Sequence, residues 1–325
     1  MDTFRTPINI PASKNKINYH SSCFFIGSCF TESIGNYLKD LKFQTDINPF
    51  GIVYNPISIK NFIDFLIIGK QFSEKDLDFH NDVWFSFHHH SRFSDTDRKR
   101  CLKKINDTLR VSSGFLKKSG FLFITLGTSY IYTHKEKNIV VSNCHKLPSE
   151  TFTKSLKQPE EIYSAYSSLI KKIKTVNPSL KIIFTISPVR HVNDGFIENQ
   201  RSKSILFVAV HKIMEKFENC SYFPAYEIMM DELRDYRFYA DDMIHPNDTA
   251  INYIRRKFIE KYIDKASQEI MAEIEKLVRA KNHRTFFPET PSHKIFLKKN
   301  LQKISGMKKQ FPFLDLQEFE DYFRN

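Results

Sequence analysis

The sequence predicts an α/β protein: a three-layer α/β/α sandwich with a mainly parallel sheet. Two observations predict this class. Short apolar runs, typical of buried strands, alternate along the chain with longer segments in which apolar residues recur at helical spacing. No repeat and no linker rich in proline or glycine interrupts the alternation. A chain of 325 residues with 41% apolar residues is long enough to bury a sizeable core.

The expected elements follow one another in a regular order. The first strand covers 22–27 and ends at Gly27, and a helix over 31–41 follows it. Further strands are expected at 121–127, at 181–187 and near 221–226, and further helices at 58–69, 98–117, 159–176, 202–219 and 247–263. Because ligands of such folds bind outside the carboxyl ends of the strands, we expect the functional residues there.

The end of the first strand carries two side chains that can act as nucleophiles, Ser28 and Cys29, directly after Gly27. A buried strand that ends in glycine can turn sharply into a helix. The helix N-terminus then offers free N–H groups and positive potential to the residue at the turn. Such a site lowers a thiol pKa and stabilises an oxyanion, although an ordinary tight turn explains the same residues.

A partner for this nucleophile lies far downstream, where Asp242 and His245 have the spacing Asp-x-x-His. Nucleophilic catalysis needs an imidazole that takes the proton and a carboxylate that orients the imidazole, and one short loop can carry both. The alternative is a capped turn, in which Asp242 caps locally and Asn247 caps the helix that follows.

A nucleophile after the first strand and an Asp-x-x-His motif before the last helix of the domain resemble the arrangement in the SGNH or GDSL hydrolase superfamily. The resemblance to the GSCFA family is closer, because that family takes its name from the motif found here at 27–30. Similar stretches follow in family order at 48–56, 126–129, 143–146, 187–190 and 242–246, over roughly residues 20 to 260. The resemblance implies a flavodoxin-like, SGNH-type domain, for which we expect the bounds 1–265. It also implies activity on small acyl groups carried by a sugar or a similar alcohol.

The register of the resemblance leaves the nucleophile open. When this segment is aligned without a gap to the superfamily pattern Phe-x-Gly-Asp-Ser-Leu, Cys29 takes the place of the nucleophilic serine and Ser28 takes the place of the aspartate. We expect Cys29 to attack, since a thiolate is the stronger nucleophile near neutral pH. The other assignment, with Ser28 attacking and Cys29 packed as a small apolar residue, stays open.

For the oxyanion, the superfamily uses a glycine N–H and an asparagine side chain. Gly51 looks like the first, but the block that should hold the asparagine reads Gly-Thr-Ser here. A hairpin is expected in which 121–133 runs into a polar turn at 134–138 and returns through 139–141. We expect this turn to bring Asn143 near Thr128 or Ser129, where it replaces the missing donor or only closes the hairpin.

Four residues are expected to contact the substrate: Asn55, Trp84, His89 and Arg190. Trp84 and His89 belong to an aromatic stretch that ends in three adjacent histidines and that forms either a wall of the substrate cleft or a structural loop. Adjacent side chains on an extended segment alternate faces, so we expect no metal there. Arg190 follows the strand at 181–187 and could bind an anionic group or pair with a surface acid. Asn199, Gln200 and Ser202 are weaker candidates just beyond it.

The C-terminal segment 266–325 is expected to form a basic helical extension packed on the main domain. Residues 276–309 contain ten lysines or arginines and a single acid, and contribute much of the formal net charge of +12. Such a surface attracts polyanions. Apolar residues are interleaved with the basic ones, which favours packed helices over a nucleic-acid or membrane arm, and no nucleic-acid-binding motif was found.

The remaining features limit the class of protein. No apolar run is long enough to span a membrane, and residues 1–7 lack the order of a signal peptide. Five widely spaced cysteines do not form a disulfide framework, so we expect a cytoplasmic protein. The sequence predicts an acyl-ester hydrolase or acyltransferase that uses a covalent acyl-enzyme and no cofactor. The alternative is an inactive SGNH-like module that binds a glycan or an anion. The substrate and the oligomeric state are not predicted.

Overall fold

The computed structural model describes residues 5–283 and 286–324. Met1 to Phe4, on which part of the signal-peptide expectation depends, lie outside the described residues. A five-stranded sheet runs through the main domain, with every neighbouring pair parallel and the order β10-β9-β5-β1-β2. Its strands are β1 (Ser22–Gly27), β2 (Gln44–Ile47), β5 (Phe121–Leu126), β9 (Lys181–Ile186) and β10 (Cys220–Tyr222). The predicted parallel sheet is therefore confirmed.

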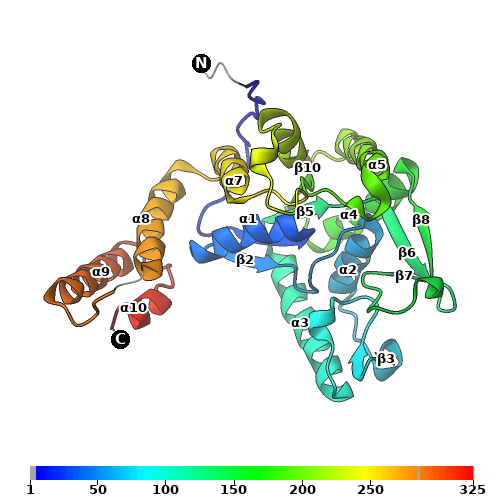
Figure 1. Cartoon of the computed structure of the whole chain (residues 1–325), viewed down its shortest axis with the longest axis horizontal. Helices are drawn as coiled ribbons and strands as arrows, with labels where there is room; N and C mark the ends of the chain where they lie inside the picture. Colours follow the sequence, from blue (N-terminus) through cyan, green and yellow to red (C-terminus); the bar gives the residue numbers. More distant parts are fainter. Residues whose placement is uncertain (1–4, 284–285, 325) are drawn as a thin grey trace.

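Helices cover both faces of the sheet and complete the three predicted layers (Figure 1). One face packs against α2 (Pro56–Ile68), α3 (Arg98–Lys118), α4 (Pro159–Val176) and α5 (Gly195–Lys216). The other face packs against α1 (Cys29–Asp40) and α7 (Asp248–Tyr262). Successive residues of β1 alternate between the two cores, with Phe24 on one side and Phe25 on the other.

The strand order reverses at β1, because the chain moves from β1 to β2 on one side and then to β5 on the other. In open parallel sheets this reversal opens a crevice at the carboxyl ends of the strands. Gly27, the last residue of β1, pairs with Thr125 of β5 at this place. The fold thus puts the turn after β1 where a ligand site is expected.

Three elements of the main domain differ from the expectation. β2 was not predicted, because it is a short edge strand whose residues are half-exposed and mostly polar. Helix α5 begins at residue 195 rather than 202. The prediction missed its first turn because the exposed side chains of Phe196 and Ile197 disturb the amphipathic pattern. The first helix, α1, begins at residue 29 rather than 31, so Cys29 is its first residue.

Smaller strands lie beside the main sheet. The predicted hairpin is present: β6 (Tyr130–His134) pairs with β7 (Ile139–Val141), with Tyr132 opposite Val141. β8 (Phe152–Leu156) extends it, and β3 (Asp78–His80) with β4 (Val83–Phe85) forms a second hairpin. Short helical turns lie between the longer helices and strands of the chain: η1 (Glu74–Asp76), η2 (Ser91–Phe93), η3 (Ser149–Thr151), η4 (Val192–Asp194), α6 (Ala225–Glu227), η5 (Ile228–Glu232) and η6 (Tyr236–Phe238).

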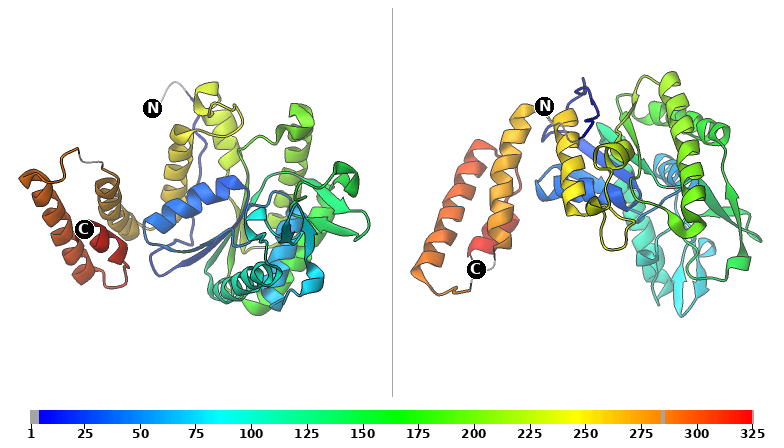
Figure 2. Two further views of the ribbon diagram at one scale, coloured as in Figure 1. Left: turned by 60° about the horizontal axis from the view of Figure 1, so that its bottom comes forward. Right: turned by 45° about the horizontal axis from the view of Figure 1, so that its top comes forward.

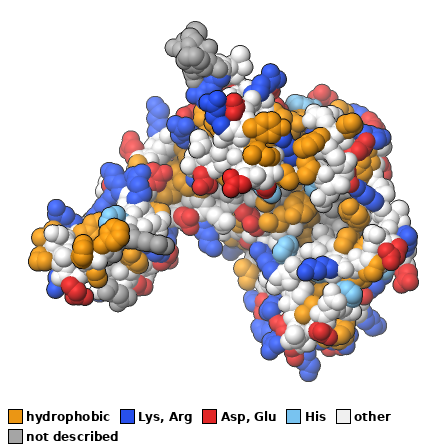
Figure 3. Space-filling view, in the orientation of Figure 1, with side chains coloured by type: hydrophobic (Ala, Val, Ile, Leu, Met, Phe, Trp, Pro, Cys, Tyr) orange, Lys and Arg blue, Asp and Glu red, His pale blue; other side chains and the backbone are white. Residues whose placement is uncertain are grey.

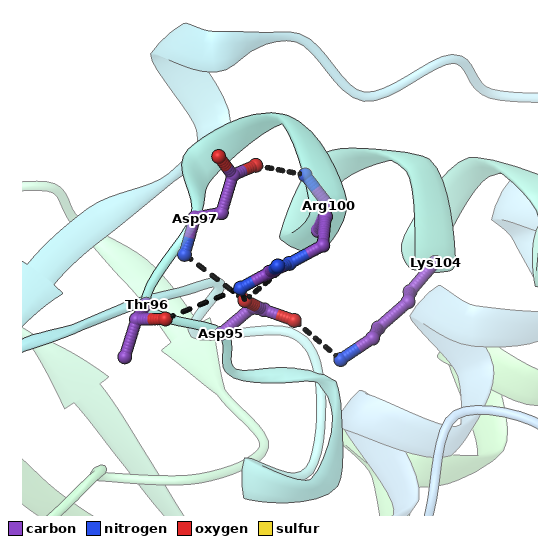
Figure 4. Close-up of polar contacts among 5 residues, drawn as sticks. All are labelled: Asp95, Thr96, Asp97, Arg100 and Lys104. Atoms are coloured by element: carbon purple, nitrogen blue, oxygen red, sulfur yellow. Dashed lines mark hydrogen bonds and ion pairs between the residues drawn. The ribbon is translucent and has the colours of Figure 1, made fainter.

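Asp95 fixes the β3–β4 hairpin to the start of α3 (Figure 4). Its backbone bridges to Trp84 of β4, and its carboxylate binds Arg100 at 2.8 Å and Lys104 at 2.6 Å. Asp97 caps α3 by accepting from the N–H of Arg100. Lys104, the N–H of Asp97 and Arg100 together hold the pKa of the Asp95 carboxyl well below its usual range. These contacts hold the outer hairpin in place.

Three helices follow the main domain: α8 (Lys265–Asn282), α9 (Pro291–Gln310) and α10 (Gln317–Arg324). They form an arm at one side of the molecule (Figures 1 and 2), which confirms the predicted helical C-terminal extension. The arm shares a core with α1, through Ile274 and Phe319 among others, and Glu275 accepts a hydrogen bond from Tyr37 of α1. Basic and apolar side chains both reach its surface (Figure 3). None of the described helices combines the length and apolarity needed to cross a membrane.

Candidate active site

A cavity of about 310 Å³ opens at the carboxyl ends of β1 and β9. Its walls come from the β1–α1 turn, the loop before α2, the loops after β5 and β9, and the loop before α7. The nucleophile candidates and the imidazole of the Asp-x-x-His motif therefore share one cavity. The lining residues are Ser28, Cys29, Tyr54, Gly127, Ser187, Val189, Arg190, His191, Val192, Asn193, Ile244 and His245.

Gly27 makes the sharp turn between β1 and α1 possible. Its φ is +142°, and a Cβ atom at this position would lie 2.2 Å from the carbonyl oxygen of Thr125. Only glycine avoids both the strained backbone and the collision. The N–H of Gly27 donates to the Asn48 side chain at 2.8 Å, and the N–H of Ser28 donates to the Thr125 carbonyl at 3.2 Å. The turn is thereby held rigidly against β5.

Ser28 and Cys29 differ in exposure. Ser28 is 2% exposed, and its hydroxyl oxygen has no hydrogen-bond partner among the described residues. Cys29 is half-buried and also borders a second cavity, of about 420 Å³, which lies on the α1 and α7 side. Burial raises the pKa of the Cys29 thiol, the N–H groups of Phe30 and Cys29 lower it, the charge of Glu32 raises it, and the charge of Lys203 lowers it.

Asp242 acts both as a cap and as a partner of His245. Its Oδ1 accepts from the backbone N–H groups of Ile244 and His245, each at 2.9 Å. Its Oδ2 lies 2.6 Å from Nδ1 of the His245 ring. The backbone N–H of His245, the ring of His245 and the N–H of Ile244 lower the pKa of Asp242 to about 2. The two alternatives left open by the sequence, a capped turn and an orienting carboxylate, are thus both present.

The loop that carries His245 is fixed at both ends. Tyr239 and Pro246 form an isolated bridge, and the N–H of Ala240 donates to the His245 carbonyl at 2.8 Å. Asn247 caps α7 by accepting from the N–H of Ala250 at 3.1 Å. With Nδ1 bonded to Asp242, the neutral ring presents Nε2 as the acceptor.

The expected oxyanion donors are not gathered at this cavity. The N–H of Gly51 already donates to the Asn48 carbonyl at 2.8 Å, and a Cβ there would collide with His90. Asn143 uses its Oδ1 to accept from the N–H of His145 at 2.8 Å, and its own N–H points to the Phe87 carbonyl. The hairpin register is as expected, but the chain leaves β7 at residue 141 and turns toward Phe87. Neither residue lines the cavity.

Thr128 and Ser129 are buried and bonded to Ser202 of α5. The Thr128 hydroxyl lies 2.9 Å from the Ser202 hydroxyl, and the N–H of Ser129 donates to the same oxygen at 2.7 Å. These three residues join the loop after β5 to α5 rather than facing a ligand. Gly127, just before them, does line the cavity, although its N–H donates to the Tyr54 carbonyl.

Among the expected substrate contacts, Arg190 reaches the cavity. Its guanidinium carbon lies 4.1 Å from the centre of the Tyr239 ring, and Nη1 donates to the Met243 carbonyl at 3.3 Å. These contacts attach Arg190 to the His245 loop and leave it at the cavity wall. Its charge therefore lies beside the candidate base.

The other three expected contacts have structural surroundings. Asn55 caps α2 by accepting from the N–H of Ser58 at 2.8 Å. The Trp84 ring contacts the tilted ring of Phe79 and the guanidinium of Arg98, and it does not line the cavity. His89 is fully buried, neither ring nitrogen has a described partner, and its ring packs against Phe50, Phe62, Phe72 and Phe93. This packing corrects the expectation that His89 contacts substrate, because the side chain has no surface to offer.

Sequence reasoning missed two groups at the site. His191 lines the cavity beside His245 and lies edge-on to Tyr54, and its N–H is held by the buried side chain of Asn199. Lys203 is buried behind the cavity wall. The only signal for Lys203 was a lysine on the apolar face of an expected helix, one position after Ser202.

Comparisons with curated proteins and with solved structures give only distant similarities. No curated protein matches the chain. Among solved structures, it is similar to a carbohydrate esterase family 3 protein from Talaromyces cellulolyticus, with a TM-score of 0.36, 8% identity, and coverage of 79% of this chain and 99% of the other. It is also similar to the acetyl xylan esterase Est2A from the rumen bacterium Butyrivibrio proteoclasticus, with a TM-score of 0.38, 13% identity, and coverage of 78% and 64%. These TM-scores are too low for an argument.

The family models are more informative than these distant structures. The C-terminal domain model of GSCFA domain proteins matches residues 274–325, which cover most of α8 to α10. The model of the GSCFA family matches residues 22–258, which include the β1–α1 turn, the cavity and the Asp-x-x-His loop. Since this match covers well over half of the chain, the protein belongs to the GSCFA family.

Proposed function

We propose that this protein is an acyl-transferring enzyme, an acyl-ester hydrolase or an acyltransferase, that works through a thioester on Cys29. The observation that carries the proposal is the Asp242–His245 pair, whose imidazole lines the same cavity as Cys29. A carboxylate 2.6 Å from Nδ1 orients the ring and leaves Nε2 to accept a proton. A module that only binds a ligand has little need of this arrangement.

The reaction follows from these positions. His245 takes the thiol proton as the Cys29 sulfur attacks the carbonyl carbon of an ester. When the carbon–oxygen bond breaks, His245 returns that proton to the leaving alkoxide, and the acyl group remains on sulfur. Water or a second alcohol then attacks the thioester, His245 accepts its proton, and the proton returns to the departing sulfur. The choice between water and alcohol decides between hydrolase and transferase.

Cys29 is preferred over Ser28 as the nucleophile because of exposure and position. Cys29 is the first residue of α1 and borders both cavities. Burial raises the pKa of its thiol, and the N–H groups of Phe30 and Cys29 offset part of that rise. Ser28 is nearly fully buried. The same N-terminal turn of α1 offers its N–H groups to developing negative charge.

Intact-mass spectrometry tests this proposal. Wild type, Cys29→Ala, Ser28→Ala and His245→Ala are exposed to an activated acetyl ester. We expect an acetyl adduct on wild type and Ser28→Ala, none on Cys29→Ala, and adduct formation about 10² to 10⁴-fold slower on His245→Ala. An adduct lost only in Ser28→Ala moves the nucleophile by one residue. Equal labelling of all four proteins contradicts the proposal.

The second candidate is a module that binds an anionic or glycan ligand without chemistry. Arg190 at the cavity wall favours it, since a guanidinium is suited to carboxylate, sulfate or phosphate groups. Calorimetric titration with an acidic sugar, compared between wild type and Arg190→Gln, tests this function. Binding lost in the variant, together with no acyl adduct on wild type, would favour the module.

A further inference from the structure

Lys203 is a fully buried lysine with no carboxylate partner among the residues that the structure describes. It lies in α5, is 1% exposed, and donates from Nζ to the backbone carbonyl of Ser187 at 2.7 Å. Its other close neighbour is the ring of Tyr226, whose centre is 5.8 Å from Nζ. Within residues 5–283 and 286–324, no carboxylate forms an ion pair with it. Burying an unpaired ammonium is costly, and an apolar side chain would fill the same space at lower cost.

The position of this charge relates it to the site. Ser187 follows β9 directly and lines the cavity together with Cys29. The ammonium that binds the Ser187 carbonyl therefore lies just behind the cavity wall. It does not need to touch the ligand, because electrostatic interactions act over several ångströms in a water-poor interior.

The charged and titratable groups around Cys29 and Lys203 come from several elements. Glu32 of α1 and Tyr54 of the loop before α2 face Cys29. His191 of the loop after β9 and Tyr226 of α6 face Lys203, and His245 lines the cavity. Burial lowers the pKa of Lys203 to about 7, and negative charge on Cys29 raises it. The charge of Lys203 lowers the pKa of Cys29, while that of Glu32 raises it.

We propose that the Lys203 ammonium is the counter-charge of Cys29, buried behind the wall and held by Ser187, and that it stabilises the thiolate. The thiol proton passes to His245 and Lys203 keeps its own proton, so an ammonium–thiolate pair forms without an external reactant. The thiolate part of this proposal does not depend on the proposed function. Its extension to the oxyanion of an attacked ester rests on the proposed function: there Lys203 would supply part of the potential that the missing asparagine provides.

Alkylation of Cys29 tests the charge directly, because iodoacetamide reacts with the thiolate. Peptide mass spectrometry follows the modification of Cys29 itself between pH 5.5 and pH 10, so the other four cysteines do not interfere. The proteins are wild type, Lys203→Met, Lys203→Arg and Lys216→Met, the last being an exposed lysine of the same helix. Thermal unfolding establishes that each variant is folded.

In Lys203→Met, we expect the midpoint of the alkylation profile to move up by about one pH unit, with about tenfold slower alkylation at pH 7. Lys203→Arg restores part of the rate, and Lys216→Met behaves as wild type. A residue that only held the Ser187 carbonyl would leave the midpoint unchanged, and that result overturns the proposal. If neither Lys203→Met nor Lys203→Arg folds, Lys203→Gln serves as the neutral variant.

The outcome is separable from that of the proposed function, because alkylation needs no ester. A shifted alkylation midpoint with no acetyl adduct on wild type would keep the charge pair and remove the acyl-transfer function. An acetyl adduct on Cys29 with an unshifted midpoint would keep the enzyme and remove the role of Lys203.

Discussion

Asp242 binds its own turn with one carboxylate oxygen and the ring of His245 with the other, 2.6 Å from Nδ1. The turn that shapes the loop and the contact that orients the base are therefore one structure. Both side chains are nearly half exposed, at 45% and 48%. His245 lines the cavity, while the backbone around the pair is fixed.

The first prediction concerns this pair. Asp242→Asn should slow acetyl-adduct formation on Cys29 by at least 10²-fold, because the amide neither selects the Nε2-basic tautomer nor stabilises the imidazolium. The neighbouring exposed Asp241→Asn is the matched control and should react as wild type. Stopped-flow measurement with a chromogenic acetate provides the rates. Equal rates for the two variants would remove Asp242 from the mechanism.

The second prediction concerns the turn after β1. Gly27→Ala should lower the free energy of unfolding by about 2–4 kcal/mol, since the new Cβ meets the Thr125 carbonyl oxygen and the φ of +142° is strained for alanine. Gly114→Ala, inside α3 with open space around it, is the control. It should be neutral or more stable by up to about 1 kcal/mol. Urea denaturation measures both, and an unaffected Gly27→Ala would mean that the turn has a different backbone.

The third prediction concerns the contribution of His89 to the pH dependence of stability. Burial holds the pKa of His89 well below its usual range, so the folded state keeps it neutral while the unfolded chain protonates it below about pH 6.5. The unfolded state then binds more protons, and stability falls as the pH drops, by up to about 2 kcal/mol between pH 6.5 and 5. His89→Phe, which suits the surrounding phenylalanines, should lose less stability over this range than wild type.

Urea denaturation at pH 7.5 and pH 5 compares wild type with His89→Phe. Burial also lowers the pKa of His88 and His145, so wild type retains part of its acid sensitivity for other reasons. The difference between the two proteins isolates His89. The same variant should form the acetyl adduct at the wild-type rate, whereas a loss of activity with normal stability would return His89 to the list of substrate contacts.

The fourth prediction concerns the C-terminal arm. Phe323 of α10 is 1% exposed within the core shared with α1 and α7. Phe323→Ala should lower the free energy of unfolding by about 3–5 kcal/mol through lost burial and the cavity left behind. Tyr322→Ala, at a side chain 43% exposed, is the control and should cost less than about 1 kcal/mol. A small effect at Phe323 would show that the arm does not stabilise the protein.

Local patterns were enough to predict much of the fold. The strand that ends at Gly27, the alternation of strands and helices, and the β6–β7 hairpin all follow from periodicity and turn residues. The same local logic predicted the Asp242–His245 contact, because the two residues are three positions apart in one turn. It missed β2, whose polar edge residues carry no strand pattern.

The order of the elements, the turn before Cys29 and the Asp-x-x-His loop could be predicted from the sequence, because each depends on residues close together in the chain. Which residues meet at the cavity depends on the packing of the whole domain. It brought His191 to the wall, buried His89 among phenylalanines, directed Asn143 away, and placed Lys203 behind Ser187. These outcomes depend on packing between side chains that are distant in the sequence, and such contacts have no local sequence pattern from which they could be predicted.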